Sequence, residues 1–416
     1  MSLANEASLL LIPSGYKSGK VYSVFPTDGD GDFTFSRGSD GTRVGAGGLV
    51  ETISSNVPRL DYSNGDCPSL LLEPQRTNLM LFSEEFSGSN WVSVRTSLTS
   101  NTITSPNGQI TADKLQRTST SASYLSHIIY KSGAITYTTS AFVKKGSDDY
   151  FSMRAQGSYP SRVDIRFRFD TEQIYYAQSV SNFTLIDSGV KNYSNGWYRL
   201  HFTYTTDTHT NLNITFSPRS TNGNIDNADS SSSSFAYVWG AQTEVGNYQS
   251  SYIKTTSGTV TRQKDICING GDANLFDISE GTFFINVTPY IYPSANTYIS
   301  LNDGGSSDRF VFIFQTYGTA VRLFGVSSGS NFLSNYQDIT FNQKNKIAIT
   351  FKQNEFKIYV NGLLKYTDTS GNVPIGLNQL DFTEHNGNRN FQGKVHDTRV
   401  YDRVLTQAEA IELTTL

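Results

Sequence analysis

The sequence has few cysteines, no large excess of either charge and no long apolar run. Its two cysteines, Cys67 and Cys267, are too few for a cysteine-based zinc site, and we expect both to be reduced thiols. The 33 basic and 37 acidic residues form no basic stripe, so nucleic acid is not an expected partner. Because no segment approaches the ~20 apolar residues of a membrane helix, we also expect no membrane insertion.

Two further patterns are missing. The apolar stretch at residues 9–12 is shorter than the core of an export signal and follows no basic leader. If the chain begins at Met1, we therefore expect that it is not exported by the usual route. No repeat of solenoid length is visible, which argues against a β-helix.

Aromatic residues, glycine and small polar residues are abundant instead. There are 26 Phe, 24 Tyr and 34 Gly, whereas charged residues make up only 17% of the chain. Aromatic side chains suit the half-buried faces of sheets, and Gly, Asn and Ser suit tight turns. The composition therefore predicts many short strands joined by turns.

Local patterns support this prediction. Apolar residues alternate with polar ones in three clear segments, residues 165–169, 198–204 and 347–360. The pair Asn361-Gly362 predicts a hairpin turn, because both turn positions need a positive φ. Thr406, followed three residues later by Glu409, predicts a capped helix at the C-terminal end of the sequence.

We predict an all-β chain with two jelly-roll β-sandwich domains after a small irregular N-terminal region. Residues 1–77 are rich in turns and look too small for a large core, so we interpret them as a docking or oligomerisation region. Residues 78–264 and 265–416 each contain enough alternating segments for a sandwich of their own.

Several segments occur together in an order that resembles a modular family of bacteriophage tail, baseplate and fibre proteins. They are residues 32–37 (DFTFSR), 48–51, 56–62 (NVPRLDY), 70–79 (LLLEPQRTNL), 83–86, 195–200 (NGWYRL), 239–246 (WGAQTEVG) and 251–253. This resemblance covers roughly residues 30–264 and implies a carbohydrate-binding-module-like jelly roll over residues 78–264.

The last region resembles a laminin-G or concanavalin A-like sandwich. The segments that carry this resemblance are residues 357–362 (KIYVNG), 391–395 (FQGKV) and 399–406 (RVYDRVLT). A last strand that runs into a capped helix is typical of that fold, but a fold alone does not define a ligand.

The resemblance implies a virion structural protein, such as a head or tail fibre, a baseplate component or a capsid decoration protein. Such a protein is assembled in the host cytoplasm, contacts other virion proteins and host surface polysaccharide, and forms a homo-oligomer, which we expect to be a trimer. Two alternatives stay open: a secreted bacterial glycan-binding adhesin, and a glycoside hydrolase or lyase.

We do not expect an enzyme. The pattern Gly-x-Ser-x-Gly at residues 325–329 lies among strands, whereas a hydrolase nucleophile of this type needs a strand-to-helix turn. No Glu-x-Asp-x-Glu run places paired carboxylates on one strand face, as concanavalin A-like hydrolases require.

Candidate binding residues are aromatic side chains near arginine. Tyrosine rings can pack against the C–H faces of sugars while polar groups fix the hydroxyls. The candidates for carbohydrate binding are Trp91, Tyr150, Tyr159, Arg166, Arg168, Tyr175 and Tyr176. Each tyrosine has core packing as its alternative role, and Trp197 and Trp239 adjoin apolar alternation and are expected in the core.

A cofactor is not expected, with calcium as the one exception considered. Sandwiches of the concanavalin A-like type sometimes hold calcium in rim loops, and calcium prefers carboxylate and amide oxygens. The candidate ligands are Asn302, Asp303 and Asp308. The five histidines have no spacing typical of a metal site.

Overall fold

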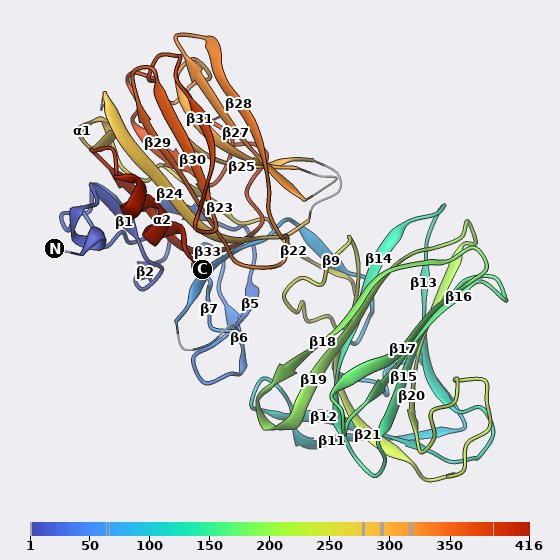
Figure 1. Cartoon of the computed structure of the whole chain (residues 1–416). Helices are drawn as coiled ribbons and strands as arrows, with labels where there is room; N and C mark the ends of the chain where they lie inside the picture. The colour runs from blue at the N-terminus through green and yellow to red at the C-terminus, as the bar shows by residue number, and fades with distance from the viewer. Residues whose placement is uncertain are drawn as a thin grey trace. The chain divides into compact units, whose positions relative to one another are not determined.

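The computed structural model describes residues 2–63, 65, 67–276, 279–291, 295–315, 319–385 and 387–416. The chain forms two compact units (Figure 1). The first comprises Met1–Ala46, Thr52–Gln75 and Gln263–Leu416, and the second comprises Gly47–Glu51 and Arg76–Arg262. The strands of the main sandwich sheets pair antiparallel, and the all-β prediction with multiple sandwich sheets is confirmed.

The first unit is a sandwich of a large and a small sheet. The large sheet has the order β31 (Leu363–Asp368), β30 (Glu355–Val360), β29 (Asn345–Lys352), β24 (Glu280–Pro289), β33 (Gly393–Tyr401), β8 (Ser69–Leu72) and β7 (Leu60–Asp61), with β1 (Leu9–Leu11) also pairing with β33. The small sheet has the order β28 (Ser330–Asp338), β27 (Ala320–Ser327), β26 (Arg309–Phe314), β25 (Thr297–Asn302) and β32 (Gln379–Asp381).

The remaining elements of the N-terminal and C-terminal segments are short. A four-stranded sheet has the order β2 (Tyr16–Lys17), β3 (Lys20–Val21), β4 (Phe33–Ser36) and β23 (Ile266–Ile268), and a two-stranded sheet contains β5 (Gly41–Val44) and β6 (Val50–Ile53). The helices are a 3₁₀ turn (Leu3–Glu6), α1 (Ala273–Phe276) and α2 (Gln407–Thr414). None of the described helices is long and apolar enough to span a membrane.

The core of the first unit lies between its two main sheets. Phe283 of β24 faces Phe312 of β26 with 4.9 Å between the ring centroids, and both rings are buried. Leu9 and Leu70, from the N-terminal segment, belong to the same buried cluster. Hydrophobic side chains from the two ends of the sequence therefore form one core.

This arrangement differs from the predicted division at residue 77. The N-terminal segment does not form a unit of its own, because β1 and β8 both pair with β33, near the end of the chain. The other expected boundary, between residues 264 and 265, lies two residues from the end of the second unit at Arg262. A role in docking or oligomerisation for residues 1–77 remains a prediction.

Two local predictions are confirmed in the first unit. Asn361 and Gly362 have φ values of 49° and 82° and form the turn between β30 and β31. The side chain of Thr406 accepts a hydrogen bond from the backbone N–H of Glu409, whose own carboxylate accepts one from the backbone N–H of Thr406. This capping box starts α2, which packs on the outer face of the large sheet through Ala410 and Leu413.

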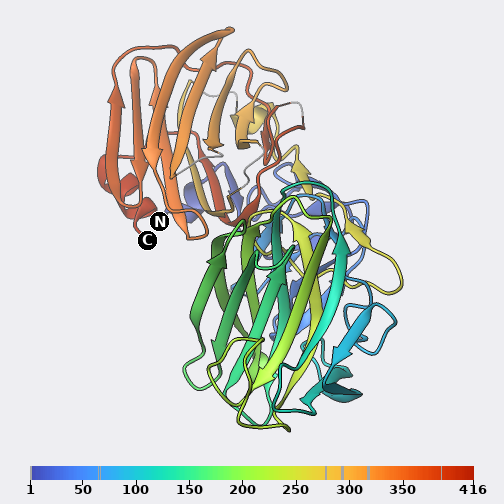
Figure 2. The same ribbon diagram turned by 90° about the vertical axis from the view of Figure 1, so that its right-hand side faces the viewer.

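The second unit is a sandwich of two six-stranded sheets (Figure 2). One sheet has the order β10 (Trp91–Val94), β13 (Tyr124–Tyr130), β20 (Asn211–Arg219), β15 (Tyr150–Gln156), β16 (Arg162–Arg168) and β17 (Gln173–Val180). The other has the order β11 (Thr96–Thr104), β12 (Ile110–Arg117), β21 (Phe235–Val245), β14 (Thr136–Lys145), β19 (Trp197–Thr205) and β18 (Thr184–Tyr193). Strands β9 (Arg76–Asn78) and β22 (Val260–Arg262) pair with each other, and a 3₁₀ turn (Ser194–Gly196) precedes β19.

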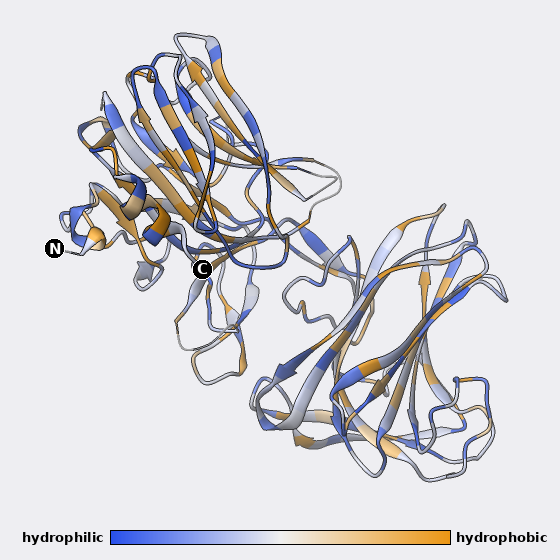
Figure 3. Cartoon of the chain, viewed as in Figure 1, coloured by the Kyte–Doolittle hydropathy of each residue, from blue (hydrophilic) through white to orange (hydrophobic). Residues whose placement is uncertain are grey.

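Hydrophobic and hydrophilic residues both occur along the strands of this second unit (Figure 3), and the hydrophobic ones form its core. Val163, Ile165 and Phe167 are fully buried, whereas the alternate positions of β16 lie on the outer face of the sheet. Trp197 and Trp239 are both 1% exposed, which confirms that they are core residues. The period-two pattern in the sequence thus identifies which face of β16 packs in the core and which face points away from it.

Candidate functional site

The outer face of β15, β16 and β17 gathers most of the predicted binding residues. Tyr150 of β15 pairs with Arg168 of β16, and Arg166 pairs with Tyr176 of β17. Residues directly opposite on neighbouring strands place their side chains on the same face, close enough to contact each other. Four residues from three neighbouring strands thereby form one group.

A β-bulge adds Tyr175 to this group. Arg166 and Phe167 are neighbours on β16, but they pair with Tyr176 and Ile174 of β17. Tyr175 is therefore the extra residue of a bulge in β17. In a regular strand Tyr175 and Tyr176 would point to opposite faces, but a bulge re-aims a side chain. The Tyr175 ring consequently lies 5.6 Å from the Tyr150 ring, with an interplanar angle of 69°.

Aromatic rings and guanidinium groups are in contact across this face. The guanidinium carbon of Arg166 lies 3.8 Å from the centroid of the Tyr176 ring, and that of Arg168 lies 5.6 Å from the Tyr150 ring. Such cation–π contacts hold a ring and a planar cation in a fixed relative orientation. We call these five residues, Tyr150, Arg166, Arg168, Tyr175 and Tyr176, the Tyr–Arg surface.

The Tyr–Arg surface is partly open to solvent. Tyr175 is 37% exposed and the Arg168 side chain is 40% exposed, whereas Tyr150, Arg166 and Tyr176 are half-buried. Burial raises the pKa of the Tyr175 hydroxyl, and the nearby Arg166 opposes that rise. The phenol therefore stays protonated near neutral pH and remains able to donate a hydrogen bond.

The loop after β20 borders this surface. The backbone carbonyl of Asn222 accepts hydrogen bonds from Arg166 Nη1 at 2.7 Å and from the Tyr175 hydroxyl at 3.3 Å. Next to it, Arg154 donates to Asn224 at 2.6 Å and to Asp226 at 2.8 Å, and Ile225 is buried. The loop thus contacts side chains from β15, β16 and β17.

Asn222 is a contact that the sequence analysis did not identify. It lies in a stretch rich in Ser, Asn and Gly, which reads only as a loop. Its role depends on a backbone carbonyl rather than on its side chain, so the residue type gives no signal.

Tyr159 is separate from the Tyr–Arg surface. It lies in the turn between β15 and β16, is 76% exposed, and lines a hollow of about 300 Å³ together with Asp207 and His209. The guanidinium carbon of Arg162 lies 5.9 Å from the centroid of the Tyr159 ring. The sequence analysis grouped Tyr159 with Arg166 and Arg168, but Tyr159 lies next to the start of β16 and the two arginines lie near its end.

Trp91 was wrongly included among the candidates for sugar contact. It is 7% exposed, and its ring packs 4.8 Å from Phe86 and 5.7 Å from Phe216 between centroids. Its indole N–H donates to the carbonyl oxygens of Leu81 and Phe82 at 3.2 Å. A ring enclosed in this way has no free face for a sugar, and it contributes to the core instead.

The three calcium candidates are hydrogen-bonded to nearby backbone N–H groups. Asn302 is fully buried, and its side-chain oxygen accepts from the N–H of Gly304 at 2.9 Å. Asp303 accepts from the N–H of Gly305 at 2.8 Å, and Asp308 accepts from the N–H groups of Ser328 and Ile375 at 3.1 and 2.9 Å. One oxygen of each side chain thus faces a backbone N–H donor, and the described residues contain no cluster of three His, Cys, Asp or Glu side chains arranged for a metal.

The Gly-x-Ser-x-Gly segment is a hairpin. Ser327 ends β27, Ser328 and Gly329 have positive φ, and β28 follows directly. The Ser327 hydroxyl donates to the carbonyl oxygen of Val373 at 3.1 Å. This geometry differs from the strand-to-helix turn on which hydrolases present a nucleophilic serine.

The C-terminal part of the chain matches a family model. Residues 273–410 match a family described as the concanavalin A-like lectin/glucanases superfamily. The C-terminal part of the chain is therefore a laminin-G/concanavalin A-like domain, as its last strand and helix predicted. The match begins after the N-terminal strands that complete the large sheet. No curated protein matches the chain.

Solved structures with partial similarity include glycan-binding modules. The carbohydrate-binding module CBM40 of a Ruminococcus gnavus IT-sialidase, bound to α2,3-sialyllactose, is 19% identical, covers 35% of this chain and 86% of its own, and has a TM-score of 0.30. Domain 4 of a Geobacillus stearothermophilus extracellular arabinanase, in complex with arabinotriose, is 17% identical, with coverages of 41% and 82% and a TM-score of 0.30. A pentraxin from Limulus polyphemus is 13% identical, with coverages of 32% and 69% and a TM-score of 0.26. Likenesses this partial do not bear on the function of this chain.

Proposed function

We propose that the chain is a non-enzymatic structural protein of a bacteriophage particle that binds glycans through the Tyr–Arg surface. The observation that carries the binding part of this proposal is the convergence of three tyrosine rings and two guanidinium groups on one open patch of sheet. The virion part is supported by the ordered sequence segments between residues 30 and 264 that resemble phage tail, baseplate and fibre proteins.

The chemistry of the Tyr–Arg surface suits a sugar chain. The apolar C–H faces of a sugar ring pack against aromatic rings, while phenol and guanidinium groups hydrogen-bond to its hydroxyls. Tyr150 and Tyr175 are held at a fixed angle, and the Asn222 carbonyl fixes Arg166 and Tyr175, so little side-chain entropy remains to be lost on binding. A protein displayed in many copies on a particle needs only modest affinity at each such site.

Glycan binding is tested with the full-length protein on an array of bacterial surface polysaccharides, followed by calorimetry with the glycan that binds most tightly. The double variant Tyr175→Ala/Tyr176→Ala should bind about tenfold more weakly, because two aromatic contacts of ~0.5–1.5 kcal/mol each are removed. Tyr336→Ala is the matched control, since Tyr336 is a 57% exposed tyrosine on β28 of the first unit. Absence of binding on the array, or equal binding by the double variant, would contradict the proposal.

The virion location is tested by labelling. Particles purified from cells that produce this chain should bind gold-labelled antibody against it, and dissociated particles should contain the chain as an oligomer, with a trimer expected. Labelling of the bacterial surface without labelling of particles would support the secreted adhesin instead.

The absence of catalysis is a separate part of the proposal. Incubation of the bound polysaccharide with the protein should release no reducing ends above the buffer control. Release of reducing ends or of unsaturated sugars would establish a glycoside hydrolase or lyase.

A further inference from the structure

The exposed ring of Tyr159 and the Tyr–Arg surface lie at opposite ends of β16, in the same unit. Tyr159 precedes the start of the strand, whereas Arg166 and Arg168 lie near its end. The strand is seven residues long. At ~3.3 Å per residue its two ends are about 20 Å apart, which is much longer than a single sugar ring.

The outer face of β17 connects these two ends. Tyr176, Gln178 and Val180 are alternate residues of β17, so their side chains share one face, and the Tyr176 hydroxyl donates to the side-chain oxygen of Gln178. Gln178 is exposed, whereas the other two are half-buried. β17 ends at Val180, and the next two residues, Ser181 and Asn182, line the hollow of about 300 Å³. The face of β17 therefore leads from the Tyr–Arg surface to this hollow.

The hollow combines an exposed ring with available polar groups. Ser158, Ser181, Asn182 and Thr208 line it and are all exposed, and their side chains make no hydrogen bond to another described residue. The ring of Tyr159, which also lines the hollow, is 76% exposed. An aromatic face with hydroxyl and amide groups beside it suits a sugar ring, which has an apolar C–H face and hydroxyls at its rim.

A nearly buried ion pair holds the loops around the hollow. The Asp207 carboxylate accepts hydrogen bonds from the backbone N–H groups of Ser158 and His209, both at 3.1 Å. Lys131 Nζ lies 3.6 Å from the same carboxylate, and the two side chains are 0% and 9% exposed for Lys131 and Asp207. The β15–β16 and β19–β20 loops are thereby tied together, so the hollow is formed before a ligand arrives.

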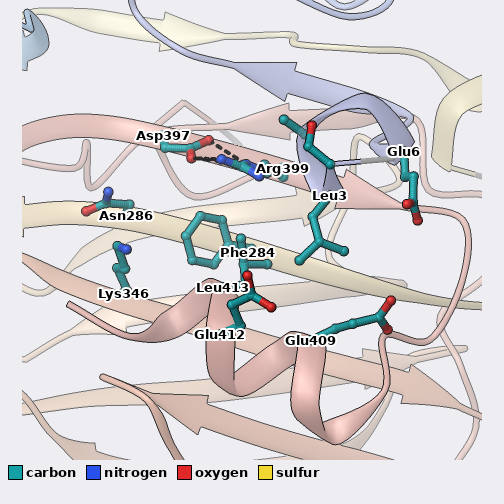
Figure 4. A pocket seen from close by; sticks show the side chains of 12 residues that line it. Leu3, Glu6, Phe284, Asn286, Lys346, Asp397, Arg399, Glu409, Glu412 and Leu413 are labelled. Carbon is teal, nitrogen blue, oxygen red and sulfur yellow. Dashed lines mark hydrogen bonds and ion pairs between the residues drawn. The ribbon is translucent and has the colours of Figure 1, made fainter.

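A larger hollow, of about 580 Å³, lies beside α2 in the first unit and differs in chemistry (Figure 4). Figure 4 shows Asp397 joined to Arg399, whose Nε lies 3.0 Å from both carboxylate oxygens, and Glu409 lies 2.9 Å from Arg403. Phe284, the aromatic residue in its lining, is 1% exposed and offers no ring face to a sugar. This hollow therefore lacks the exposed ring that the smaller one has.

We infer that the glycan site of the second unit extends along β16 and β17 from the Tyr–Arg surface to Tyr159 and its hollow. Its ligand is an extended polysaccharide chain that is contacted over several consecutive sugars. This inference rests on the proposed binding of glycans by the Tyr–Arg surface. One sugar packs against Tyr175 and Tyr176, and a sugar further along the same chain packs against Tyr159, whereas a single sugar engages only one end.

The test uses the full-length protein and the polysaccharide that binds most tightly on the array, cut by partial acid hydrolysis into oligosaccharides of defined length. Calorimetry compares fractions that are shorter and longer than ~20 Å when extended. The longer fractions should bind about tenfold more tightly, because linked contacts at both ends reinforce each other. Tyr159→Ala should remove most of this advantage and leave the affinity for short fractions unchanged, since these bind at the Tyr–Arg surface.

Tyr130→Ala is the matched control. Tyr130 is an 81% exposed tyrosine at the end of β13, which β20 and β15 separate from β16 in the same sheet. This variant should keep the full dependence on length, and both variants should keep the far-UV circular dichroism spectrum of the unmodified protein, because both rings are largely exposed.

Equal affinity for short and long fractions would overturn the inference, as would a dependence on length that Tyr159→Ala does not reduce. Either result would leave glycan binding by the Tyr–Arg surface intact. Failure of every fraction to bind would instead contradict the proposed function, and the inference with it.

Discussion

The carboxylate of Asp265 lies 3.1 Å from the guanidinium of Arg37, although 228 positions separate the two residues in the chain. Both side chains are fully buried. Arg59 contacts the other oxygen of the same carboxylate and also lies 2.7 Å from Glu73. This buried network joins the N-terminal segment to the residues that precede β23, within the first unit.

The network predicts a large effect from a single substitution. Asp265→Ala should lower the free energy of unfolding of the first unit by about 3–5 kcal/mol, because two buried guanidinium groups lose their shared partner. Urea unfolding followed by far-UV circular dichroism measures this loss. Asp402→Ala, at an exposed position in the same unit, should change stability by less than ~0.5 kcal/mol. Similar values for both variants would show that the network does not hold the unit together.

The large sheet of the first unit contains strands from both ends of the sequence, and this predicts how a fragment behaves. A fragment of residues 265–416 lacks β1, β7 and β8, which pair on one side of the large sheet, and lacks Leu9 and Leu70 from the core. It should therefore expose an unpaired edge of β33 and aggregate, or melt without a cooperative transition. Co-production with residues 1–75 as a separate chain should restore a soluble complex, measured by size-exclusion chromatography. A fragment that is soluble and folded alone would contradict the account of a single core.

Local signals in the sequence predicted the local structure well. The alternation at Ile165 and Phe167, the turn at Asn361-Gly362 and the capping box at Thr406 each depend on residues within a few positions of one another. The pairing of β8 with β33 has no such signal, because the two strands are more than 300 positions apart and neither short segment specifies its partner. The N-terminal segment was therefore taken for a separate region.

For the candidate site too, the sequence predicted local features but not those that depend on the three-dimensional arrangement. Cross-strand neighbours such as Arg166 and Tyr176 follow from two alternating strands, but the bulge that brings Tyr175 to the same face does not. Trp91 shows the converse error, since an isolated tryptophan gives no periodic pattern that reveals whether its ring is enclosed. Tyr159 was grouped with the others through its residue type, although its turn lies at the other end of β16.

Calcium removal should leave the protein unchanged. One side-chain oxygen each of Asn302, Asp303 and Asp308 accepts hydrogen bonds from backbone N–H groups, which a cation bound to that oxygen would have to displace. The thermal unfolding midpoint should therefore be the same with excess EDTA and with excess calcium. A calcium-dependent rise that Asp303→Asn or Asp308→Asn abolishes would show that these residues rearrange to hold the ion.

A buried histidine should make the second unit less stable at mildly acidic pH. His127 is 2% exposed, its Nε2 accepts from the backbone N–H of Leu81 at 3.1 Å, and burial lowers its pKa to about 4. Protonation would turn this acceptor into a donor facing another donor. Between the unfolded-state pKa of ~6.5 and the folded value, the unfolded chain binds the extra proton, so stability falls as pH falls.

The expected slope is about 1.4 kcal/mol for each pH unit well below 6.5, until the folded pKa is approached. Urea unfolding at a series of pH values, followed by tryptophan fluorescence, reports on the second unit because Trp91, Trp197 and Trp239 all lie there. His127→Gln offers an acceptor oxygen that does not titrate, so its stability should fall less between pH 6 and pH 5 than that of the unmodified protein. Equal slopes for the two proteins would mean that another group controls the pH dependence.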